Sequence, residues 1–372
     1  ARTFGMEGMF RQLGIYSSVG QLYDPDDSNQ LMYYKEDKKG QMLEEGISEP
    51  GAFSAWLAAA TSYSVNNYPL IPFYIGYSMF GFQRVGDLSW AAGDSRARGF
   101  LIGATAGRTT LNGEGLQHQD GHSHVLASTI PNCVSYDPAF AYELAIIVQD
   151  GLRRMYEKME SVFYYITTMN ENYIQPEMPA KCEADIIKGM YLLEDGASEE
   201  YKTKTKKEVR VRLLGSGTIL REVRKAAAVL RVDYNVLVDV WSVTSFNELR
   251  KEALAVTREN MLNPARKQRL PFVTQALSTQ QGPVIAATDY MKSYANQVRA
   301  YVPAAYRVLG TDGFGRSDSR EKLRHFFEVD SKFVVLAALT ELKSGKLISS
   351  KQITDFMTQN GIKKDKVNPI TQ

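Results

Sequence analysis

The sequence predicts an α/β protein in which helices cover largely parallel sheets. Short apolar runs, typical of buried strands, alternate with longer amphipathic segments that are typical of helices, and this alternation occurs in two series along the chain. Residues 170–208 separate the two series, with two prolines and a charged stretch poor in apolar residues. A length of 372 residues fits two or three domains.

The first series begins after a polar, irregular segment. Residues 20–40 mix Asp, Ser, Asn and Lys with scattered Tyr, which indicates a long surface loop, either a flexible connection or a segment that orders over a ligand. The patterns that follow predict buried strands at residues 69–77, 100–107, 130–138 and 161–169, and helices at residues 51–63, 83–99 and 139–159. A short helix is expected at residues 184–194, inside the charged stretch.

The second series repeats the alternation in the rest of the chain. The patterns predict strands at residues 209–214, 236–243, 282–290 and 306–311, and helices at residues 216–231, 245–260, 291–302, 319–329, 331–345 and 349–361. We therefore expect a first domain at residues 1–195, a linker at 196–208 and a second domain at 209–372.

Composition excludes several classes of protein. The formal charge is +2, from 44 Lys and Arg against 42 Asp and Glu, so no nucleic-acid partner is expected. No apolar run approaches the ~20 residues that span a bilayer, so no membrane partner is expected either. The two cysteines, Cys133 and Cys182, are too few for a disulfide scaffold and fit a reducing compartment, which favours the cytoplasm. The first residues have no signal-peptide pattern and no initiator Met, which indicates a processed, trimmed or partial chain.

The densest chemistry lies in the glycine-rich segment GRTTLNGEGLQHQDGHSH, residues 107–124. It contains three of the four histidines of the chain and two acids: His118, His122, His124, Glu114 and Asp120. Metal binding is one interpretation, although the histidine spacing matches no common ligand pattern and no cysteine is nearby. A structural loop with satisfied histidines is a second. We favour a catalytic or substrate-binding loop, because imidazole is the usual proton carrier near neutral pH and glycine permits tight turns beside a ligand.

Three other polar segments have both a structural and a functional interpretation. Glu49 precedes an apolar helix, and its position alone favours a simple acid at a helix N-terminus. The GSG at residues 215–217 lacks the third glycine of a dinucleotide loop and the Lys of a P-loop, which favours a tight structural turn. The polar end of the strand at residues 164–173 either contributes to a site or satisfies backbone groups in a turn.

The segment GTDGFGRSDSR, residues 310–320, also looks like a loop that could bind a ligand. Ser317 and Asp318 are good helix N-cap residues, and Ser319 can serve as well. Structural capping is favoured, and a role at an interface or a ligand site remains the alternative.

Five long segments together resemble one family. They are KEDKKGQMLEEGISE, IPFYIGYSMFGFQRVGD, TTLNGEGLQHQDGHSH, YYITTMNENY and GTDGFGRSDSREKLRHFFEVD. They are similar to the homodimeric bacterial pyruvate dehydrogenase, the thiamine diphosphate-dependent decarboxylating component of the pyruvate dehydrogenase complex, and the similarity runs over essentially the whole chain. The resemblance implies a transketolase-like fold, in which a pyrimidine-binding parallel-sheet domain is followed by a C-terminal α/β domain.

The resemblance also implies the cofactors, thiamine diphosphate and Mg²⁺. Family members have a further N-terminal domain that holds the diphosphate through Mg²⁺ with a GDG motif followed by an Asn. This chain has GDL at residues 86–88 and TDG at 311–313 but no such element, so no metal-ligating residue is assigned here. The chain then supplies the pyrimidine side of the cofactor site and is expected to be inactive without the N-terminal domain.

Matching the motifs residue by residue gives a candidate pyrimidine site. Glu49 falls where the family has the glutamate that hydrogen-bonds the pyrimidine ring nitrogen and so controls a proton on the cofactor. Tyr77 and Phe80 fall where the family contacts this ring, and aromatic faces suit stacking on a flat ring. Plain core packing is the alternative for both aromatic residues.

The glycine-rich segment gives the other candidates. Glu114 and His118 match active-site positions of the family. The resemblance implies that His118 transfers a proton during acetyl transfer to lipoamide and that Glu114 positions it. His122 and His124 are weaker candidates.

The activity that the resemblance implies is oxidative decarboxylation of pyruvate, in the class EC 1.2.4.1, with transfer of the acetyl group to lipoamide. The implied partners are a second copy of the chain and the lipoyl-bearing dihydrolipoyl acetyltransferase core, and residues 20–40 match a segment expected to order over the cofactor. Two alternatives remain, a transketolase that moves two-carbon units and a non-catalytic dimerisation or assembly module. The segment GEGLQHQDGHSH favours the pyruvate enzyme over the transketolase.

Overall fold

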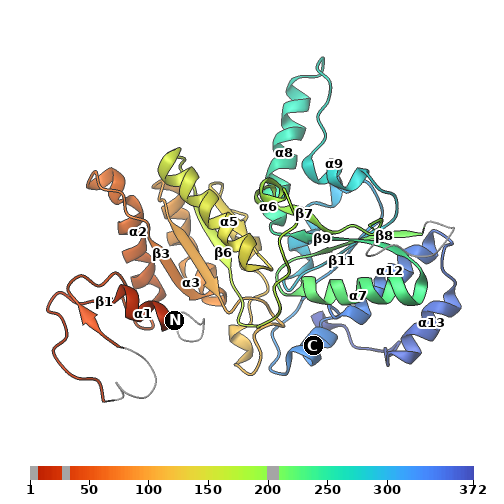
Figure 1. Cartoon of the computed structure of the whole chain (residues 1–372), viewed down its shortest axis with the longest axis horizontal. Coiled ribbons are helices and arrows are strands. Elements are labelled where there is room, and N and C mark those ends of the chain that lie inside the picture. Colours follow the sequence, from red (N-terminus) through yellow and green to blue (C-terminus); the bar gives the residue numbers. More distant parts are fainter. Residues whose placement is uncertain (1–6, 27–33, 199–208) are drawn as a thin grey trace.

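Two sheets, each with helices on both faces, lie side by side in the protein (Figure 1). The computed structural model describes residues 7–26, 34–198 and 209–372. No helix in these ranges is both long and apolar enough to cross a bilayer. The predicted α/β class and the predominance of parallel strands are confirmed.

The first sheet is parallel throughout. Within the described residues its strands lie in the order β3 (Phe73–Tyr77), β4 (Phe100–Ala104), β6 (Phe163–Thr167) and β5 (Cys133–Tyr136). Its helices are α2 (Glu49–Val65) and α3 (Ser78–Asp94) on one face, and α5 (Ala141–Leu152), with a π-helical turn at Arg153–Glu157, and α6 (Glu183–Lys188) on the other. Tyr165 packs with α2 and α3, and its neighbour Tyr164 packs with α5, so both faces of β6 are buried. This is why the strand is a continuous apolar run.

Two elements of this domain differ from the sequence prediction. The strand expected at residues 69–77 begins only at Phe73, and it is an edge strand with half-buried residues rather than a buried one. The helix expected at residues 83–99 begins at Ser78, directly after β3, and ends at Asp94. Gly81 and Gly86 lie inside this helix and weaken the helical pattern of its first turns.

The second sheet is also covered on both faces. Its strands lie in the order β11 (Tyr306–Leu309), β10 (Val284–Ala287), β8 (Arg210–Gly215), β9 (Leu237–Val243) and β7 (Met190–Glu194). One face carries α7 (Ile219–Tyr234), α11 (Arg320–Phe326), α12 (Ser331–Ser344) and α13 (Ser350–Gln359), and the other carries α8 (Phe246–Leu262), α9 (Phe272–Ser278) and α10 (Lys292–Asn296). Leu213 packs toward α7 and Leu214 toward α8, so the strand alternates between two buried cores.

The helix expected at residues 184–194 is wrong in its second half. The helix α6 ends at Lys188, because Gly189 adopts a φ of +114° and begins a turn into β7. β7 then pairs antiparallel with β9, so residues 190–194 hydrogen-bond in the second sheet. The domain limits 1–195, 196–208 and 209–372 stay a prediction.

The remaining elements are short. Near the N-terminus are α1 (Glu7–Leu13) and two parallel strands, β1 (Ile15–Tyr16) and β2 (Glu36–Asp37), so the expected surface loop at residues 20–40 contains one short strand, and its residues 27–33 lie outside the described residues. The short helix α4 spans Ser123–Ala127. Three 3₁₀ turns within the described residues lie at Leu116–His118, Arg299–Tyr301 and Pro369–Thr371. Most of the expected linker, residues 199–208, also lies outside the described residues.

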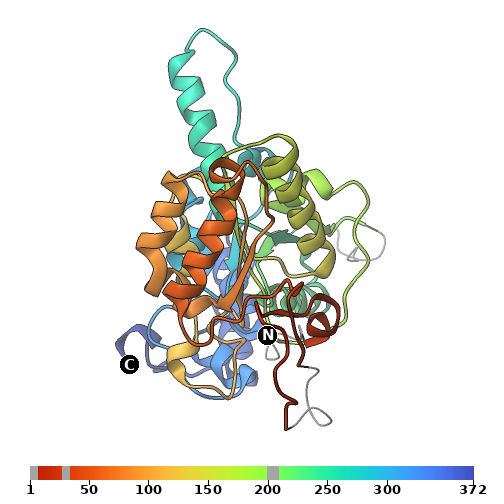
Figure 2. The same ribbon diagram turned by 90° about the vertical axis from the view of Figure 1, so that its left-hand side faces the viewer.

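One helix projects from the body of the protein. α8 and the segment that joins it to α9 form an arm that both views show standing clear of the two sheets (Figure 2). Met261, Leu262 and Leu270, which belong to this arm, are exposed.

The carboxyl ends of the parallel strands of both sheets meet at the seam between them. Thr110, beyond β4, lies with its hydroxyl oxygen 2.5 Å from that of Thr218, beyond β8. Asp289, beyond β10, accepts from the Thr110 hydroxyl at 2.6 Å. The amide of Gly217, in the GSG turn, donates to the carbonyl of Asp137, beyond β5, at 3.2 Å. Since ligands of open α/β sheets bind at this edge, the seam lies next to the expected site.

Asp137 is a buried acid of this seam. Thr167 donates a hydrogen bond to its Oδ1 at 2.8 Å, whereas its Oδ2 has no hydrogen-bond partner in the described part of the chain. Burial raises the pKa of Asp137 from 3.8 to about 7, and the negative charges of Asp289 and Asp120 add to this effect.

We expect Asp137 to make the protein less stable as the pH rises from about 4 to about 7, with no further loss above this range. Because its pKa is higher in the folded state, the folded protein keeps a proton that the unfolded chain releases in this window. One pKa unit corresponds to about 1.4 kcal/mol, so the loss amounts to about 4 kcal/mol. Urea unfolding at pH 5 and pH 8 should show a smaller pH dependence for Asp137→Asn than for the unchanged chain. Asp185→Asn, at an exposed surface pair with Lys188, is the matched control, and equal pH dependence in all three proteins would contradict the expectation.

Candidate active site

Glu49 is the first residue of α2 and lies at the edge of the first domain. Ser48 caps the helix, accepting a hydrogen bond from the amide of Gly51 at 3.3 Å, which explains why the helix begins here. The Glu49 carboxylate, 19% exposed, pairs with Arg84 of α3 at 2.8 Å. Burial raises the pKa of Tyr74 to about 12, and the negative charge of Glu49 contributes. Glu49 therefore faces β3 and α3.

Three rings gather beside this carboxylate. Tyr77 ends β3 and Phe80 lies in the first turn of α3, with their ring centroids 6.0 Å apart. The His118 ring lies 5.1 Å from Tyr77 and 5.0 Å from Phe80. The Arg84 guanidinium sits 4.2 Å from the centre of the Phe80 ring, and so joins the aromatic group to Glu49. The structure thus brings together residues from three separate segments of the sequence.

Glu114 and His118 lie four residues apart in the glycine-rich segment. The Oε2 of Glu114 is 3.7 Å from the Nδ1 of His118, a distance that suits an ion pair but not a hydrogen bond. This Nδ1 is buried and has no hydrogen-bond partner within the described residues. The His118 side chain as a whole is 25% exposed. The imidazole is therefore partly exposed, while its Nδ1 is buried and has no hydrogen-bond partner among the described residues.

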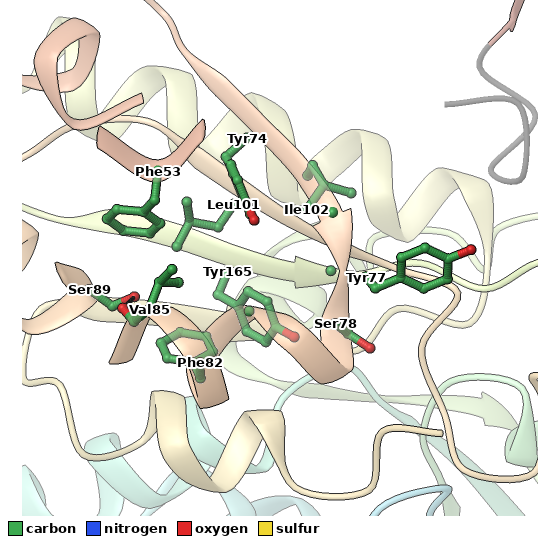
Figure 3. Close-up of a pocket in the computed structure, with 13 residues that line it drawn as sticks. Phe53, Tyr74, Tyr77, Ser78, Phe82, Val85, Ser89, Leu101, Ile102 and Tyr165 are labelled. Atoms are coloured by element: carbon green, nitrogen blue, oxygen red, sulfur yellow. Dashed lines mark hydrogen bonds between the residues drawn. The ribbon is translucent and has the colours of Figure 1, made fainter. Parts of the chain in front are cut away.

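A small cavity lies beneath Tyr77, inside the first domain. It encloses about 10 Å³ among residues of α2, α3, β3, β4 and β6. Figure 3 shows Tyr165 and Phe82 directed into it and the Tyr77 ring directed away. It is too small for a cofactor ring.

The other two histidines of the segment have different environments. The Nε2 of His122 lies 2.6 Å from the Nε2 of Gln83 on α3, close to the aromatic group. His124 is fully buried in the seam, stacked on Tyr294 at 4.9 Å and bonded to Thr167 at 2.9 Å. Burial lowers the pKa of His124 to about 3, so it is neutral, which suits packing rather than proton transfer. No three His, Cys, Asp or Glu side chains within the described ranges are grouped as metal ligands.

Two polar residues of α3 were missed by the sequence prediction. Arg84 and Gln83 contact Glu49 and His122, respectively. Arg84 follows Phe80 by four residues, and residues at this spacing share one face of a helix. The spacing is visible in the sequence, but the helix was expected to begin only at residue 83, so it was not used.

The fold and this arrangement define a transketolase-like α/β protein, and comparisons with known proteins agree. Residues 1–176 match the family model described as pyruvate dehydrogenase E1 component middle domain, and residues 189–330 match the model of the transketolase-like C-terminal domain. A transketolase from Campylobacter jejuni superimposes with a TM-score of 0.59 at 17% identity, covering 82% of this chain and 40% of that one. A structure titled split gene transketolase, inactive beta4 tetramer, superimposes with a TM-score of 0.56 at 14% identity, covering 92% of this chain and 95% of that one.

The chain belongs to the pyruvate dehydrogenase E1 component family and corresponds to its middle and C-terminal domains. It is 63% identical over 371 residues to the Pseudomonas aeruginosa E1 component and 61% identical to that of Escherichia coli. These matches cover 100% and 99% of this chain but only 41% of each relative. The chain thus spans about two fifths of the length of these relatives.

Proposed function

We propose that the chain forms the pyrimidine side of the thiamine diphosphate site in an enzyme that oxidatively decarboxylates pyruvate and passes the acetyl group to lipoamide. The observation that carries this proposal is a carboxylate, two aromatic rings and an imidazole grouped at one edge of the first sheet: Glu49, Tyr77, Phe80 and His118. The identity of 63% to a pyruvate dehydrogenase E1 component supports it.

The residues present fit an aminopyrimidine ring. Tyr77 and Phe80 offer aromatic faces for a flat ring, and Glu49 offers a carboxyl for a ring nitrogen. When bound, thiamine diphosphate supplies a thiazolium that accepts the electron pair released as carbon dioxide leaves a 2-oxo acid. Glu49 orients the pyrimidine and exchanges a proton with its nitrogen. The Mg²⁺ ligands are expected in the N-terminal part that the relatives possess.

In this proposal, His118 and Glu114 take part in the acetyl-transfer step. The partly exposed imidazole of His118 gives or takes a proton at the sulfur of lipoamide, and Glu114 orients it from 3.7 Å. The lipoamide belongs to the dihydrolipoyl acetyltransferase core, and the enzyme acts as a homodimer. Cys133 and Cys182 are both free and buried, which supports a cytoplasmic location.

A titration with thiamine diphosphate tests this proposal. We expect weak binding or none by this chain alone, and saturable, Mg²⁺-dependent binding by a longer chain that includes the N-terminal part of the relatives. Calorimetry measures the binding, and pyruvate-dependent reduction of ferricyanide measures the activity. Removal of Mg²⁺ with a chelator should abolish both in the longer chain. Tight binding by this chain alone, or a longer chain that acts on ketose phosphates but not on pyruvate, would refute the proposal.

A second function, a non-catalytic assembly module, is favoured by one comparison. The match to the split gene transketolase covers 95% of that protein, which is described as inactive and tetrameric. The same titration distinguishes the two functions, since an assembly module would leave the longer chain without pyruvate-dependent activity.

A further inference from the structure

The glycine-rich segment, residues 107–124, is part of the first domain in sequence but is held by the second domain. Near its start, the segment is held by the buried carboxylate of Asp289. This carboxylate accepts hydrogen bonds from the amide and the hydroxyl of Thr109, at 2.9 and 2.7 Å. It also accepts from the amide and the hydroxyl of Thr110, at 3.1 and 2.6 Å. Gly107 has a φ of +91°, and a Cβ there would collide with the same carboxylate. At the far end, the amide of Met291 donates to the carbonyl of Gly121 at 2.7 Å.

The outer part of the segment is held by residues around the start of α11. Ser317 donates its hydroxyl to the carbonyl of Glu114 at 2.9 Å. The amide of Arg316 donates to the side chain of Gln119 at 2.8 Å, and Arg320 donates through Nε to the carbonyl of Thr110 at 2.6 Å. These contacts join residues about 200 positions apart, and they lie on both sides of the residues proposed to move the proton, Glu114 and His118.

From these contacts we infer that the second domain positions the Glu114–His118 pair, with Ser317 and Arg320 as positioning residues. The inference rests on the proposed function, in which this pair serves acetyl transfer. The 3.7 Å separation of the two side chains depends on their backbone, because no hydrogen bond joins them. The Ser317 contact fixes the backbone at Glu114 itself. Loosening it therefore changes how the imidazole is oriented while leaving Glu49, on α2, untouched.

Two variants and a matched control test the inference. Ser317→Ala removes the contact to Glu114, and Arg320→Gln removes the contact to Thr110. Lys322→Gln removes a cation from the same helix, but this lysine is 74% exposed and pairs with Asp318 alone among the described residues. Ser317→Thr keeps the hydroxyl and should restore the behaviour of the unchanged protein.

The first readout is amide hydrogen exchange of residues 110–119, measured on this chain without cofactor. We expect exchange about fivefold faster in Ser317→Ala and Arg320→Gln, and unchanged in Lys322→Gln and Ser317→Thr. The second readout uses the longer chain. We expect acetyl transfer to lipoamide to fall about tenfold in the two variants, with ferricyanide reduction and thiamine diphosphate affinity within about twofold of the unchanged enzyme.

The outcomes separate this inference from the proposed function. Unchanged exchange in both variants overturns the inference whatever the activity is. Faster exchange with normal acetyl transfer also overturns it, provided that His118→Ala lowers acetyl transfer. If His118→Ala itself leaves acetyl transfer intact, the role of His118 in the proposed function fails, and the positioning role fails with it.

Discussion

Replacing Glu49 by Gln in the longer chain is expected to lower pyruvate-dependent turnover by about 10²–10⁴-fold, the usual contribution of a positioned proton donor. Gln keeps the size of the side chain and can still accept a hydrogen bond from Arg84, as Glu49 does at 2.8 Å. It cannot exchange a proton with a ring nitrogen. The loss therefore reports on proton control rather than on packing.

Ferricyanide reduction and calorimetry, carried out together, measure this effect. Glu45→Gln is the matched control, because Glu45 is an exposed acid four residues earlier and makes no hydrogen bond or ion pair in the described part of the chain. Its turnover should stay within about twofold of the unchanged enzyme. If Glu49→Gln retains more than about a tenth of the activity while it still binds the cofactor, Glu49 does not have the proposed role.

Replacing Asp289 by Ala is expected to destabilise the protein by about 3–5 kcal/mol. The substitution leaves the two amides and two hydroxyls of Thr109 and Thr110 without their acceptor. It also removes a negative charge close to the buried Arg324.

Urea unfolding of Asp289→Ala checks this prediction. Asp318→Ala, at a half-exposed acid, should change the stability by less than about 0.5 kcal/mol. Asp289→Asn should lie between the two, since its amide oxygen still accepts hydrogen bonds while its NH₂ group meets other donors. A loss below about 1 kcal/mol in Asp289→Ala would show that the seam does not depend on this carboxylate.

The alternation of strands and helices could be predicted because helices cover both faces of each sheet, so side chains on both sides of a central strand are buried. β6 is a largely apolar run for this reason, and the bounds of β6 and β8 differ from the prediction by two residues at most. The second half of the helix expected at residues 184–194 could have been corrected from Gly189, since glycine after a lysine commonly ends a helix. The start of α3 was obscured by two glycines.

The candidate site was predictable only in part. The resemblance supplied Glu49, Tyr77 and His118, and the structure brings the latter two into contact. Arg84 pairs with Glu49 and lies over the Phe80 ring, which in turn contacts Tyr77 and His118. The contact of Ser317 with Glu114 spans 203 residues. No periodicity or local spacing carries information on such a pair, because it arises from the docking of two domains. Capping was favoured for this stretch, and Ser319 does cap α11, while Ser317 makes the interface contact that remained the alternative.

The projecting arm formed by α8 and the segment before α9 is a suitable place to attach a label or a tag. Residues 264–270 are exposed on every side chain and lie far from the edge where the strands of the two sheets end (Figure 1). A fluorophore or an affinity tag grafted there would leave the proposed pyrimidine site undisturbed. Tethering the protein by this point on a sensor surface would leave the proposed site accessible from solution.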